Sequence, residues 1–295
     1  MELLRSFIFV PGNRANMLER ARAFNADVVM VDLEDSVPPG EKTTARDMAK
    51  EWVPTLRQEG QRVMVRVNSL DTGLTRSELE AIVSPDLYGI SLGKVESTWN
   101  IRDVDRMLSA IEPLAGVQPG AIKIVAWAET ASSLVDARDI GAASPRVIAL
   151  AFGAEDFTND MGIERKQDDI EIMYPRTQVA IAARAAGVPA LDTPFFKYRD
   201  TDGLSRDSLL SKRLGFKGKF AIHPSQIETI NISFSPSREQ LEEAKRIIEV
   251  YEEAERCGRA STSLEGMVVD VPVVRRARAL LDSINLDKDL SQELK

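Results

Sequence analysis

Cysteine and histidine are nearly absent from this chain of 295 residues, which contains one of each. The single cysteine, Cys257, excludes an intrachain disulfide framework and fits a reducing compartment. The single histidine, His223, excludes a histidine-rich metal site, and we expect it to be a structural hydrogen-bonding residue rather than a general base. Catalysis by this chain would therefore rest mostly on carboxylates, lysine, arginine and a bound metal ion.

An excess of positive charge is also missing, as is any long apolar run. The formal net charge is −8, which argues against a nucleic-acid partner. No apolar run approaches the ~20 residues that span a bilayer, and the first residues lack the pattern of a secretory signal. We therefore expect a cytoplasmic protein without a membrane partner.

The chain does contain short apolar runs rich in β-branched residues, separated by segments of helical length. Their continuous apolar character is typical of strands that are buried on both faces. Eight such units predict an α/β fold of the (β/α)8 TIM-barrel type, with a doubly wound sheet as the alternative. The eight runs are residues 6–12, 27–35, 62–68, 88–95, 122–125, 147–150, 188–195 and 219–224.

The pattern changes after the eighth run, so we assign residues 1–232 to the catalytic barrel and residues 233–295 to a C-terminal helical extension. Within the extension, residues 237–256 have a strongly amphipathic helical pattern, residues 261–266 read as a loop, and residues 273–284 as a final helix. The extension is too short for an independent metabolic domain. We expect it to act as a lid on the barrel or to pack on a neighbouring subunit.

Two acidic turns follow the fifth and sixth predicted strands and contain Glu129 and Asp156. The two residues lie 27 positions apart, about one β–α–β unit, so adjacent strand ends would bring them to one site. A hard cation such as Mg²⁺ takes oxygen ligands and often only one or two carboxylates. We predict that Glu129 and Asp156 bind metal; the alternative is that they cap the following helices. We expect Glu155 to cap a helix or to support the site, and Gly153 to let backbone N–H groups approach a ligand.

Further charged residues end the second, third and fourth predicted strands. Arg66 follows a run of valines, where it would bind either a keto-acid carboxylate or the acids Glu34 and Asp35. Together with Asp32, these two acids are predicted to orient metal-bound waters. Lys94 would pair with the same acids or form a Schiff base.

Arg14 and Asp270 lie outside these strand ends. Arg14, in the first loop, would contact a phosphate or remain in solvent. Asp270 lies between Gly266 and Pro272, in a loop that has the length to reach across an interface.

An ordered set of motifs runs from residue 5 to residue 272. It resembles the citrate lyase beta-subunit-like family, which includes malyl-CoA and citramalyl-CoA lyases and their Claisen-condensing relatives. One departure is Gly93, where the family usually has proline before the lysine, and this leaves the role of Lys94 open. The motifs are Arg5-Ser6, Phe9-Val-Pro-Gly-Asn-Arg14, Asp32-Leu-Glu-Asp-Ser-Val37, Arg66-Val-Asn68, Lys94-Val-Glu-Ser97, Ala128-Glu-Thr-Ala131, Gly153-Ala-Glu-Asp-Phe157, Leu191-Asp-Thr-Pro194, Ile222-His-Pro-Ser-Gln226 and Glu265-Gly-Met-Val-Val-Asp270.

The resemblance implies a Mg²⁺-dependent carbon–carbon lyase that cleaves, or forms by condensation, a 3-hydroxyacyl-CoA. The products of cleavage would be an acyl-CoA and a 2-keto acid such as glyoxylate, pyruvate or oxaloacetate. It implies Mg²⁺ on Glu129 and Asp156, and Asp270 as the proton-transferring group that enters the next subunit's site in a homotrimer or a multiple of it. The residues implied to bind substrate are Arg66, Glu129, Gly153, Ala154, Pro224 and, for the CoA phosphates, Arg14.

Three alternatives stay open beside this interpretation. The first is the beta subunit of a citrate lyase complex, which acts on a citryl thioester bound to a carrier protein. The second is a malate synthase, in which thioester hydrolysis accompanies condensation. The third is a non-catalytic binding or assembly protein of the same fold, against which the presence of all the expected site residues argues.

Overall fold

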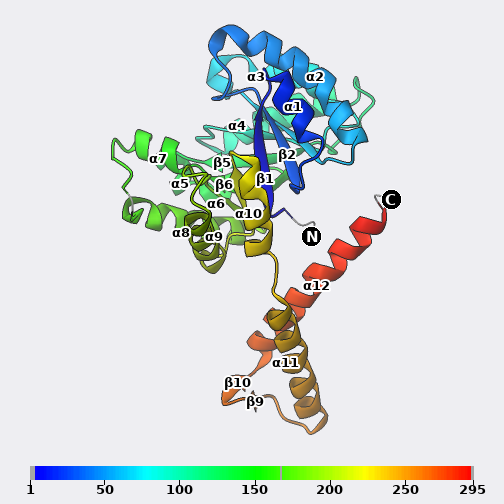
Figure 1. The fold of residues 1–295 in the computed structure, drawn as a ribbon, viewed down its shortest axis with the longest axis vertical. Helices are drawn as coiled ribbons and strands as arrows, with labels where there is room; N and C mark the ends of the chain where they lie inside the picture. Colours follow the sequence, from blue (N-terminus) through cyan, green and yellow to red (C-terminus); the bar gives the residue numbers. More distant parts are fainter. Residues whose placement is uncertain (1–3, 167, 294–295) are drawn as a thin grey trace. The chain divides into compact units, whose positions relative to one another are not determined.

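Eight parallel strands close into a barrel in the order β1 to β8, and helices surround it (Figure 1). The computed structural model describes the backbone of residues 4–166 and 168–293, and side chains up to residue 282. The predicted (β/α)8 barrel is therefore confirmed, and the doubly wound sheet is excluded by the pairing of β1 with β8. The strands are β1 Ser6–Pro11, β2 Val28–Asp32, β3 Val63–Val67, β4 Gly89–Leu92, β5 Lys123–Ala128, β6 Val147–Phe152, β7 Ala190–Asp192 and β8 Gly218–Ala221.

The helices that follow the strands cover the outside of the barrel. Capping residues define several helix starts; for example, Ser97 and Asn100 form a capping box at the start of α4. The helices are α1 Ala15–Ala21, α2 Lys42–Gln58, α3 Thr75–Ile82, α4 Thr98–Ile111, α5 Ala131–Val135, α6 Ala137–Gly141, α7 Ala154–Asp160, α8 Ile170–Ala186, α9 Thr201–Leu214 and α10 Ile227–Phe234, with short 3-10 turns at Pro39–Glu41, Leu70–Thr72 and Pro224–Gln226.

Side chains of alternate strand residues fill the barrel interior. The rings of Phe7, Trp127 and Phe220, from strands on different sides of the barrel, lie within 5.2 Å of one another in two pairs. The indole N–H of Trp127 donates to Ser91 Oγ at 2.7 Å, which satisfies its buried donor. The intervening strand residues point outward and form the larger apolar layer under the helices. This alternation decides which residues at the strand ends face the barrel axis.

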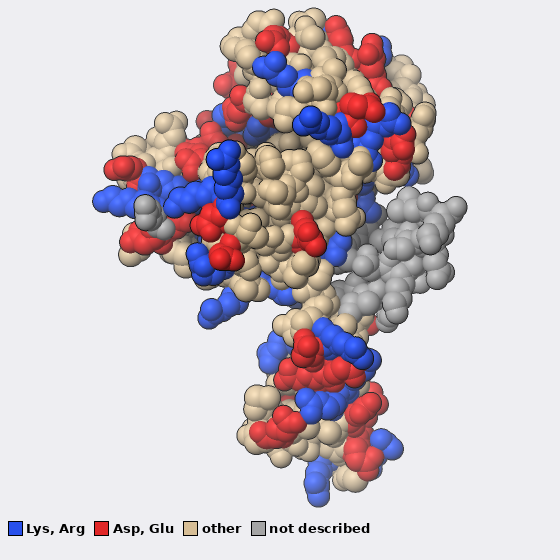
Figure 2. Space-filling view, in the orientation of Figure 1, with Lys and Arg blue, Asp and Glu red and all other residues tan. Residues whose placement is uncertain are grey.

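From Ser235 onward the chain forms a second compact unit, separate from the unit Leu4–Phe234. It consists of α11 (Arg238–Arg256), a hairpin of β9 (Thr262–Leu264) and β10 (Met267–Val269), and α12 (Val271–Glu293). A small core of Tyr251, Val269 and Val274 holds the unit together. On the face shown in Figure 2, its acidic and basic side chains are interspersed, and ion pairs such as Lys245–Glu242 at 3.0 Å link them.

The prediction of a loop at residues 261–266 was wrong, because residues 262–264 form strand β9. The two residues that connect β9 to β10, Glu265 and Gly266, have φ values of 52° and 82°. Positive φ at both positions is the geometry of a tight two-residue hairpin turn, in which glycine is favourable.

None of the helices in the described part of the chain is both long and apolar enough to cross a bilayer.

Candidate functional site

The predicted site residues of the barrel lie at the carboxyl ends of its strands. Asp32, Arg66 and Gly93 continue the inward-facing rows of β2, β3 and β4, since they have the same parity as Met30, Met64 and Ser91. Glu129 and Gly153 continue the inward rows of β5 and β6 in the same way. The alternation along parallel strands therefore directs all five positions toward the axis of the barrel mouth.

Glu129 is almost fully buried, with 4% of its surface exposed. Its backbone N–H donates to Ser133 Oγ at 3.0 Å, and Ser133 forms a capping box with Thr130 at the start of α5. Its carboxylate Oε1 accepts the backbone N–H of Lys94 at 2.5 Å. Ser133 was not predicted as a site residue, although the pair Thr130 and Ser133 is the sequence signal of such a cap.

Gly153 lies against the other oxygen of the Glu129 carboxylate. A Cβ atom at position 153 would lie 2.3 Å from Glu129 Oε2, so any side chain there would displace the carboxylate. The N–H of Gly153 donates to Ala128 O at 3.4 Å, and the N–H of Ala154 donates to Thr193 Oγ1 at 3.2 Å. These two donors, which were predicted to approach a ligand, are thus engaged within the protein.

Asp156 lies in the first turn of α7, and its side chain is half-buried. Among the described residues, its carboxylate has no hydrogen-bond or ion-pair partner. The neighbouring Glu155 is exposed and pairs with Arg165 at 2.7 Å. The two adjacent acids are therefore in different environments, and only Asp156 is left without a partner.

The guanidinium of Arg66 binds the buried Asp32 in bidentate fashion, with Nε–Oδ1 and Nη2–Oδ2 distances of 2.7 Å. The ring of Phe9 covers its face, with 4.5 Å between the guanidinium carbon and the ring centroid. The remaining nitrogen, Nη1, makes longer contacts of 3.3 Å to Glu34 and 3.4 Å to Asp35. Of the two predicted partners of Arg66, a substrate or the local acids, the structure shows the acids. Asp32, which was not expected to bind Arg66, is its main partner.

Lys94 pairs with the same acids, Glu34 and Asp35, which is one of its two predicted roles. Its Nζ lies 2.9 Å from Glu34 and 3.1 Å from Asp35. Its backbone has a φ of 51°, which is uncommon for a residue with a side chain and is found at functional sites. Gly93 leaves room for this arrangement, because a Cβ there would lie 3.0 Å from the Glu34 carboxylate and 3.1 Å from that of Glu129.

We call these seven charged residues the strand-end cluster: Asp32, Glu34, Asp35, Arg66, Lys94, Glu129 and Asp156. In this part of the described chain, five acidic groups face two cations, so the acids outnumber the cations by three.

The pKa shifts in the cluster follow this imbalance. Burial, together with the nearby Asp156, raises the pKa of Glu129 to about 8. Burial and the charge of Asp35 also raise the pKa of Asp156. Burial alone would raise the pKa of Asp32 too, but the Arg66 guanidinium lowers it below its ordinary value. Burial likewise raises the pKa of Glu34, although Arg66 and Lys94 partly offset the effect. Of the cluster's three acids with a raised pKa, Glu129 and Asp156 are the two that no cation of the described chain pairs with.

The donors at this position fit a hard divalent cation. Oε2 of Glu129 and the Asp156 carboxylate are oxygen ligands without protein cations bound to them, which Mg²⁺ prefers. Within the described residues, no group of three or more acids, histidines or cysteines forms a ready-made metal cage. A pair of carboxylates suits Mg²⁺, because this ion keeps several waters or substrate oxygens.

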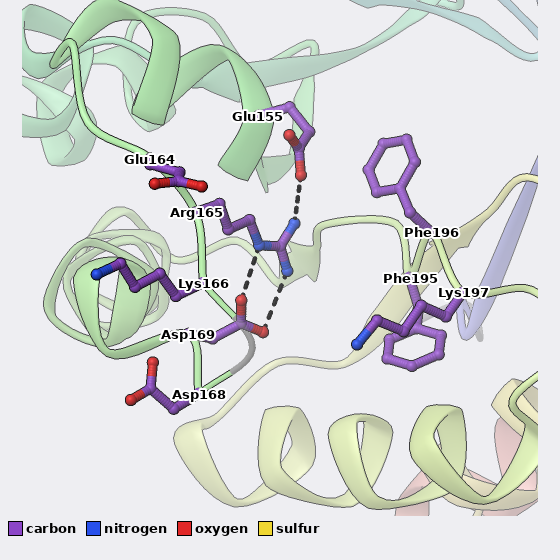
Figure 3. A pocket seen from close by; sticks show the side chains of 9 residues that line it. All are labelled: Glu155, Glu164, Arg165, Lys166, Asp168, Asp169, Phe195, Phe196 and Lys197. Carbon is purple, nitrogen blue, oxygen red and sulfur yellow. Dashed lines mark hydrogen bonds and ion pairs between the residues drawn. The ribbon is translucent and has the colours of Figure 1, made fainter.

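A pocket of about 710 Å³ lies between the turn of α7 and the loop after β7 (Figure 3). On one side of the pocket, the Arg165 guanidinium donates hydrogen bonds to Asp169 at 2.8 Å and to Glu155 at 2.7 Å (Figure 3). On the other side lie the rings of Phe195 and Phe196 (Figure 3). The pocket is lined by Glu155, the residue before Asp156, but by none of the seven residues of the strand-end cluster.

The remaining predicted residues do not belong to the strand-end cluster. Arg14 is exposed in the loop after β1, and Pro224 is exposed after β8. His223 stacks on Tyr198 with ring centroids 4.7 Å apart and accepts the N–H of Ser225 through Nδ1, in accord with a structural role. Asp270 belongs to the C-terminal unit, where its Oδ1 accepts the N–H of Val273 at 3.2 Å at the start of α12.

Fold and site together define an α/β-barrel protein with an acidic cluster at the barrel mouth. The model of the HpcH/HpaI aldolase/citrate lyase family matches residues 5–224, and the chain belongs to this family. It is 36% identical over 282 residues to the citrate lyase subunit beta of Haemophilus influenzae, covering 96% of this chain and 97% of that one.

Two further relatives show the range of the family. The chain is 33% identical to a (3S)-malyl-CoA thioesterase of Cereibacter sphaeroides, covering 94% of this chain and 93% of that one. It is also similar to the crystal structure of CitE from Mycobacterium tuberculosis in complex with magnesium, acetoacetate and coenzyme A. That structure has a TM-score of 0.78 and 29% sequence identity, and the match covers 95% of this chain and 97% of that one.

Proposed function

We propose that this chain is a Mg²⁺-dependent carbon–carbon lyase that cleaves a 3-hydroxyacyl-CoA, such as malyl-CoA or citramalyl-CoA, into an acyl-CoA and a 2-keto acid. The same site would form the bond by Claisen condensation. The observation that carries the proposal is the excess of acidic groups over cations in the strand-end cluster, where burial and then the nearby Asp156 raise the pKa of Glu129 to about 8. The magnesium, coenzyme A and keto acid named for CitE structures support the same substrate class.

Glu129 and Asp156 would hold the Mg²⁺ ion, which when bound offsets negative charge on substrate oxygens as the carbon–carbon bond breaks. Arg66 would bind the keto-acid carboxylate through Nη1, whose contacts to Glu34 and Asp35 are the longest that the guanidinium makes. The bidentate pair with Asp32 would keep the guanidinium in place.

Proton transfer completes the reaction. During cleavage the substrate hydroxyl becomes the keto carbonyl and loses a proton, while the acyl carbon takes the bonding electron pair and gains one. Asp270 would deliver that proton, or remove it in the condensing direction, from the C-terminal unit of a neighbouring chain in a homotrimer or a multiple of it. The neighbouring chain enters this proposal through the family resemblance; Asp270 itself lies in the C-terminal unit.

Asp270→Asn tests the proton-transfer role. Asparagine is as good an N-cap as aspartate, so the start of α12 should keep its stability. We expect turnover to fall about 10²–10⁴-fold, the usual contribution of a general acid or base, with unchanged Mg²⁺ affinity. Loss of Mg²⁺ binding in this variant would show that the proton-transferring acid is assigned wrongly.

Mixed oligomers test the sharing of a site between chains. Asp270→Asn and Glu129→Gln chains should each be inactive alone. When they are unfolded and refolded together, some sites would combine an intact Glu129 with an intact Asp270 of the neighbour, and activity should return. If mixing restores no activity while mixed oligomers are detected by native mass spectrometry, the shared site is excluded.

A mass-spectrometric turnover screen tests the proposed reaction itself. The purified chain would be incubated with malyl-, methylmalyl-, citramalyl- and citryl-CoA, with Mg²⁺ and with EDTA. Cleavage of one ester that EDTA stops is the expected result. Hydrolysis of the thioester without carbon–carbon cleavage would instead match the malyl-CoA thioesterase relative.

A second candidate is the beta subunit of a citrate lyase complex, which acts on a carrier-bound citryl thioester. The citrate lyase beta subunit of Haemophilus influenzae favours it, because the match covers nearly the whole of both chains. Activity of the isolated chain on a free CoA ester would show that no carrier is required. Activity only on the carrier-bound thioester would favour the second candidate.

A further inference from the structure

Helix α7, which carries Asp156, starts without a capping side chain of its own. The residue at its N-cap position is Gly153, and glycine is required there because a Cβ would lie 2.3 Å from Glu129 Oε2. The first N–H groups of a helix have no partner within the helix. The close approach of Glu129 therefore removes the side chain that would normally satisfy one of them.

Thr193, from the adjacent strand end, supplies the missing acceptor. Its Oγ1 accepts the N–H of Ala154, the first residue of α7, at 3.2 Å. Ala154 is fully buried and Thr193 is 2% exposed, so water cannot readily replace this bond. A buried N–H group that loses its acceptor costs about 1–3 kcal/mol, which is enough to shift a short helical turn.

Thr193 is itself held firmly by the residue before it. Asp192 ends β7 and is fully buried, and its carboxylate binds Arg176 of α8 at 2.6 Å and Lys219 of β8 at 2.5 Å. Asp192 points outward to these cations, while Thr193, one residue later, has the inward parity of Leu191. The strand end thus provides a fixed acceptor for α7.

The position of the Asp156 carboxylate depends on how α7 begins. Its carboxylate has no hydrogen bond or ion pair within the described chain, so the turn of α7 determines where it lies relative to Glu129. We infer that Thr193 is a positioning residue that caps α7 from the adjacent strand and holds Asp156 opposite Glu129. This inference rests on the proposed function, in which both acids bind a divalent cation.

The test measures Mn²⁺ affinity of the full chain without substrate, by electron paramagnetic resonance of free Mn²⁺. Thr193→Val keeps the shape but removes the acceptor, and we expect affinity to fall about 10–100-fold, as for other residues that orient metal ligands. Thr193→Ser restores a hydroxyl and should bind within about threefold of the wild-type chain, a margin well below the 10–100-fold loss.

Thr158→Val is the matched control. Thr158 lies on the same helix, is 4% exposed and donates to Ala154 O at 3.0 Å, but it accepts no bond from the first turn. The same isosteric change there should leave Mn²⁺ affinity within about threefold of the wild type, since no ligand-orienting bond is lost. Thermal unfolding of both valine variants separates a loss of stability from a loss of positioning.

The outcomes are distinguishable. Wild-type affinity in Thr193→Val, or an equal loss in Thr158→Val, overturns the inference. Failure of the wild-type chain to bind Mn²⁺ overturns the proposed function instead. Thr193→Ala, which removes the hydroxyl with a smaller side chain, is measured in parallel. If neither Thr193→Val nor Thr193→Ala folds, a role confined to positioning Asp156 is excluded.

Discussion

Two groups of charged residues lie near the carboxyl ends of the strands, and they differ in how their charges balance. In the strand-end cluster, five carboxylates face Arg66 and Lys94. The second group, which we call the helix-side quartet, consists of Arg176, Asp192, Asp207 and Lys219. Its two cations and two anions pair at 2.5–2.8 Å.

The protonation behaviour of the two groups differs accordingly. Burial alone would raise the pKa of Asp192, but Lys219 and Arg176 outweigh it and hold that pKa below its usual range. For Glu129, burial and the nearby Asp156 outweigh the Lys94 N–H and the Arg66 guanidinium, which lower the pKa, and the pKa rises to about 8. The comparison teaches that similar burial has opposite consequences: the quartet is complete and structural, whereas the cluster is incomplete without an added cation.

The largest effect is expected when the balance of the quartet is broken. Arg176→Met would leave Asp192 and Asp207 with Lys219 alone in a buried site. Because breaking one side of a buried ion pair leaves an uncompensated charge, we expect a loss of about 3–5 kcal/mol in unfolding free energy. Urea unfolding followed by tryptophan fluorescence measures it, since Trp52, Trp99 and Trp127 all lie in the barrel unit.

Arg76→Met is the control for this prediction. Arg76 pairs with Glu80 at 2.9 Å, but both side chains are exposed, so the same change should cost less than about 1 kcal/mol. Mg²⁺ affinity should not change in the control. Equal losses in the two variants would contradict the structural role of the quartet.

Glu129→Gln tests the opposite case, in which a charge is removed from the unbalanced cluster. Glutamine can still accept the Lys94 N–H, but one charge of the proposed metal site is lost. Mg²⁺ affinity should therefore fall at least about 100-fold, the upper end of the effect of residues that only orient ligands. Turnover should be lost with it. The metal-free variant should be at least as stable as the wild type at pH 9, where the wild-type carboxylate is charged.

Isothermal titration calorimetry and thermal unfolding measure the two effects of Glu129→Gln. Unchanged Mg²⁺ affinity would remove Glu129 from the metal site. A large loss of metal-free stability would show that the cluster, like the quartet, is structurally balanced.

A further prediction is a dependence of Mg²⁺ binding on pH. Because the pKa of Glu129 in the metal-free protein is about 8, binding below that pH must displace a proton. We expect Kd to rise about tenfold for each unit from pH 8 to pH 6 and to level off above pH 9. Glu129→Gln should lose this dependence, and a flat profile in the wild type would contradict the raised pKa.

The same shift affects folding stability with a defined sign. The folded pKa of about 8 lies above the ordinary value of 4.5, so folding takes up a proton between these values. The stability contributed by the protonated form is complete below pH 4.5 and is lost as the pH rises through 8. Saturating Mg²⁺ should remove this decline, and thermal unfolding at pH 6 and pH 9 would measure it.

Much of the fold was predictable because it follows from local patterns. The eight apolar runs and the segments between them predicted the barrel, and the ends of the strands predicted where acidic residues gather. The hairpin at residues 262–269 was missed because its strands are only three residues long, and the turn residues Glu265 and Gly266 were the available signal.

Candidate residues could be named from the sequence, but most of their contacts could not. Arg66 was predicted to bind an anion, yet its main partner is Asp32, 34 positions away on the neighbouring strand. The cap that Thr193 gives to α7 joins residues 39 positions apart. Neither pairing leaves a periodic signal, since each depends on which strand ends become neighbours.

The sequence by itself determined the order of strands and helices and, through the alternation of side chains, which strand-end residues face the barrel axis. Only the tertiary structure decided which charges are compensated, because compensation depends on distances between separate strands and on exclusion of water. That is why Asp192 and Glu129, both acids next to a strand end, differ: one is surrounded by cations, and the other faces a second acid.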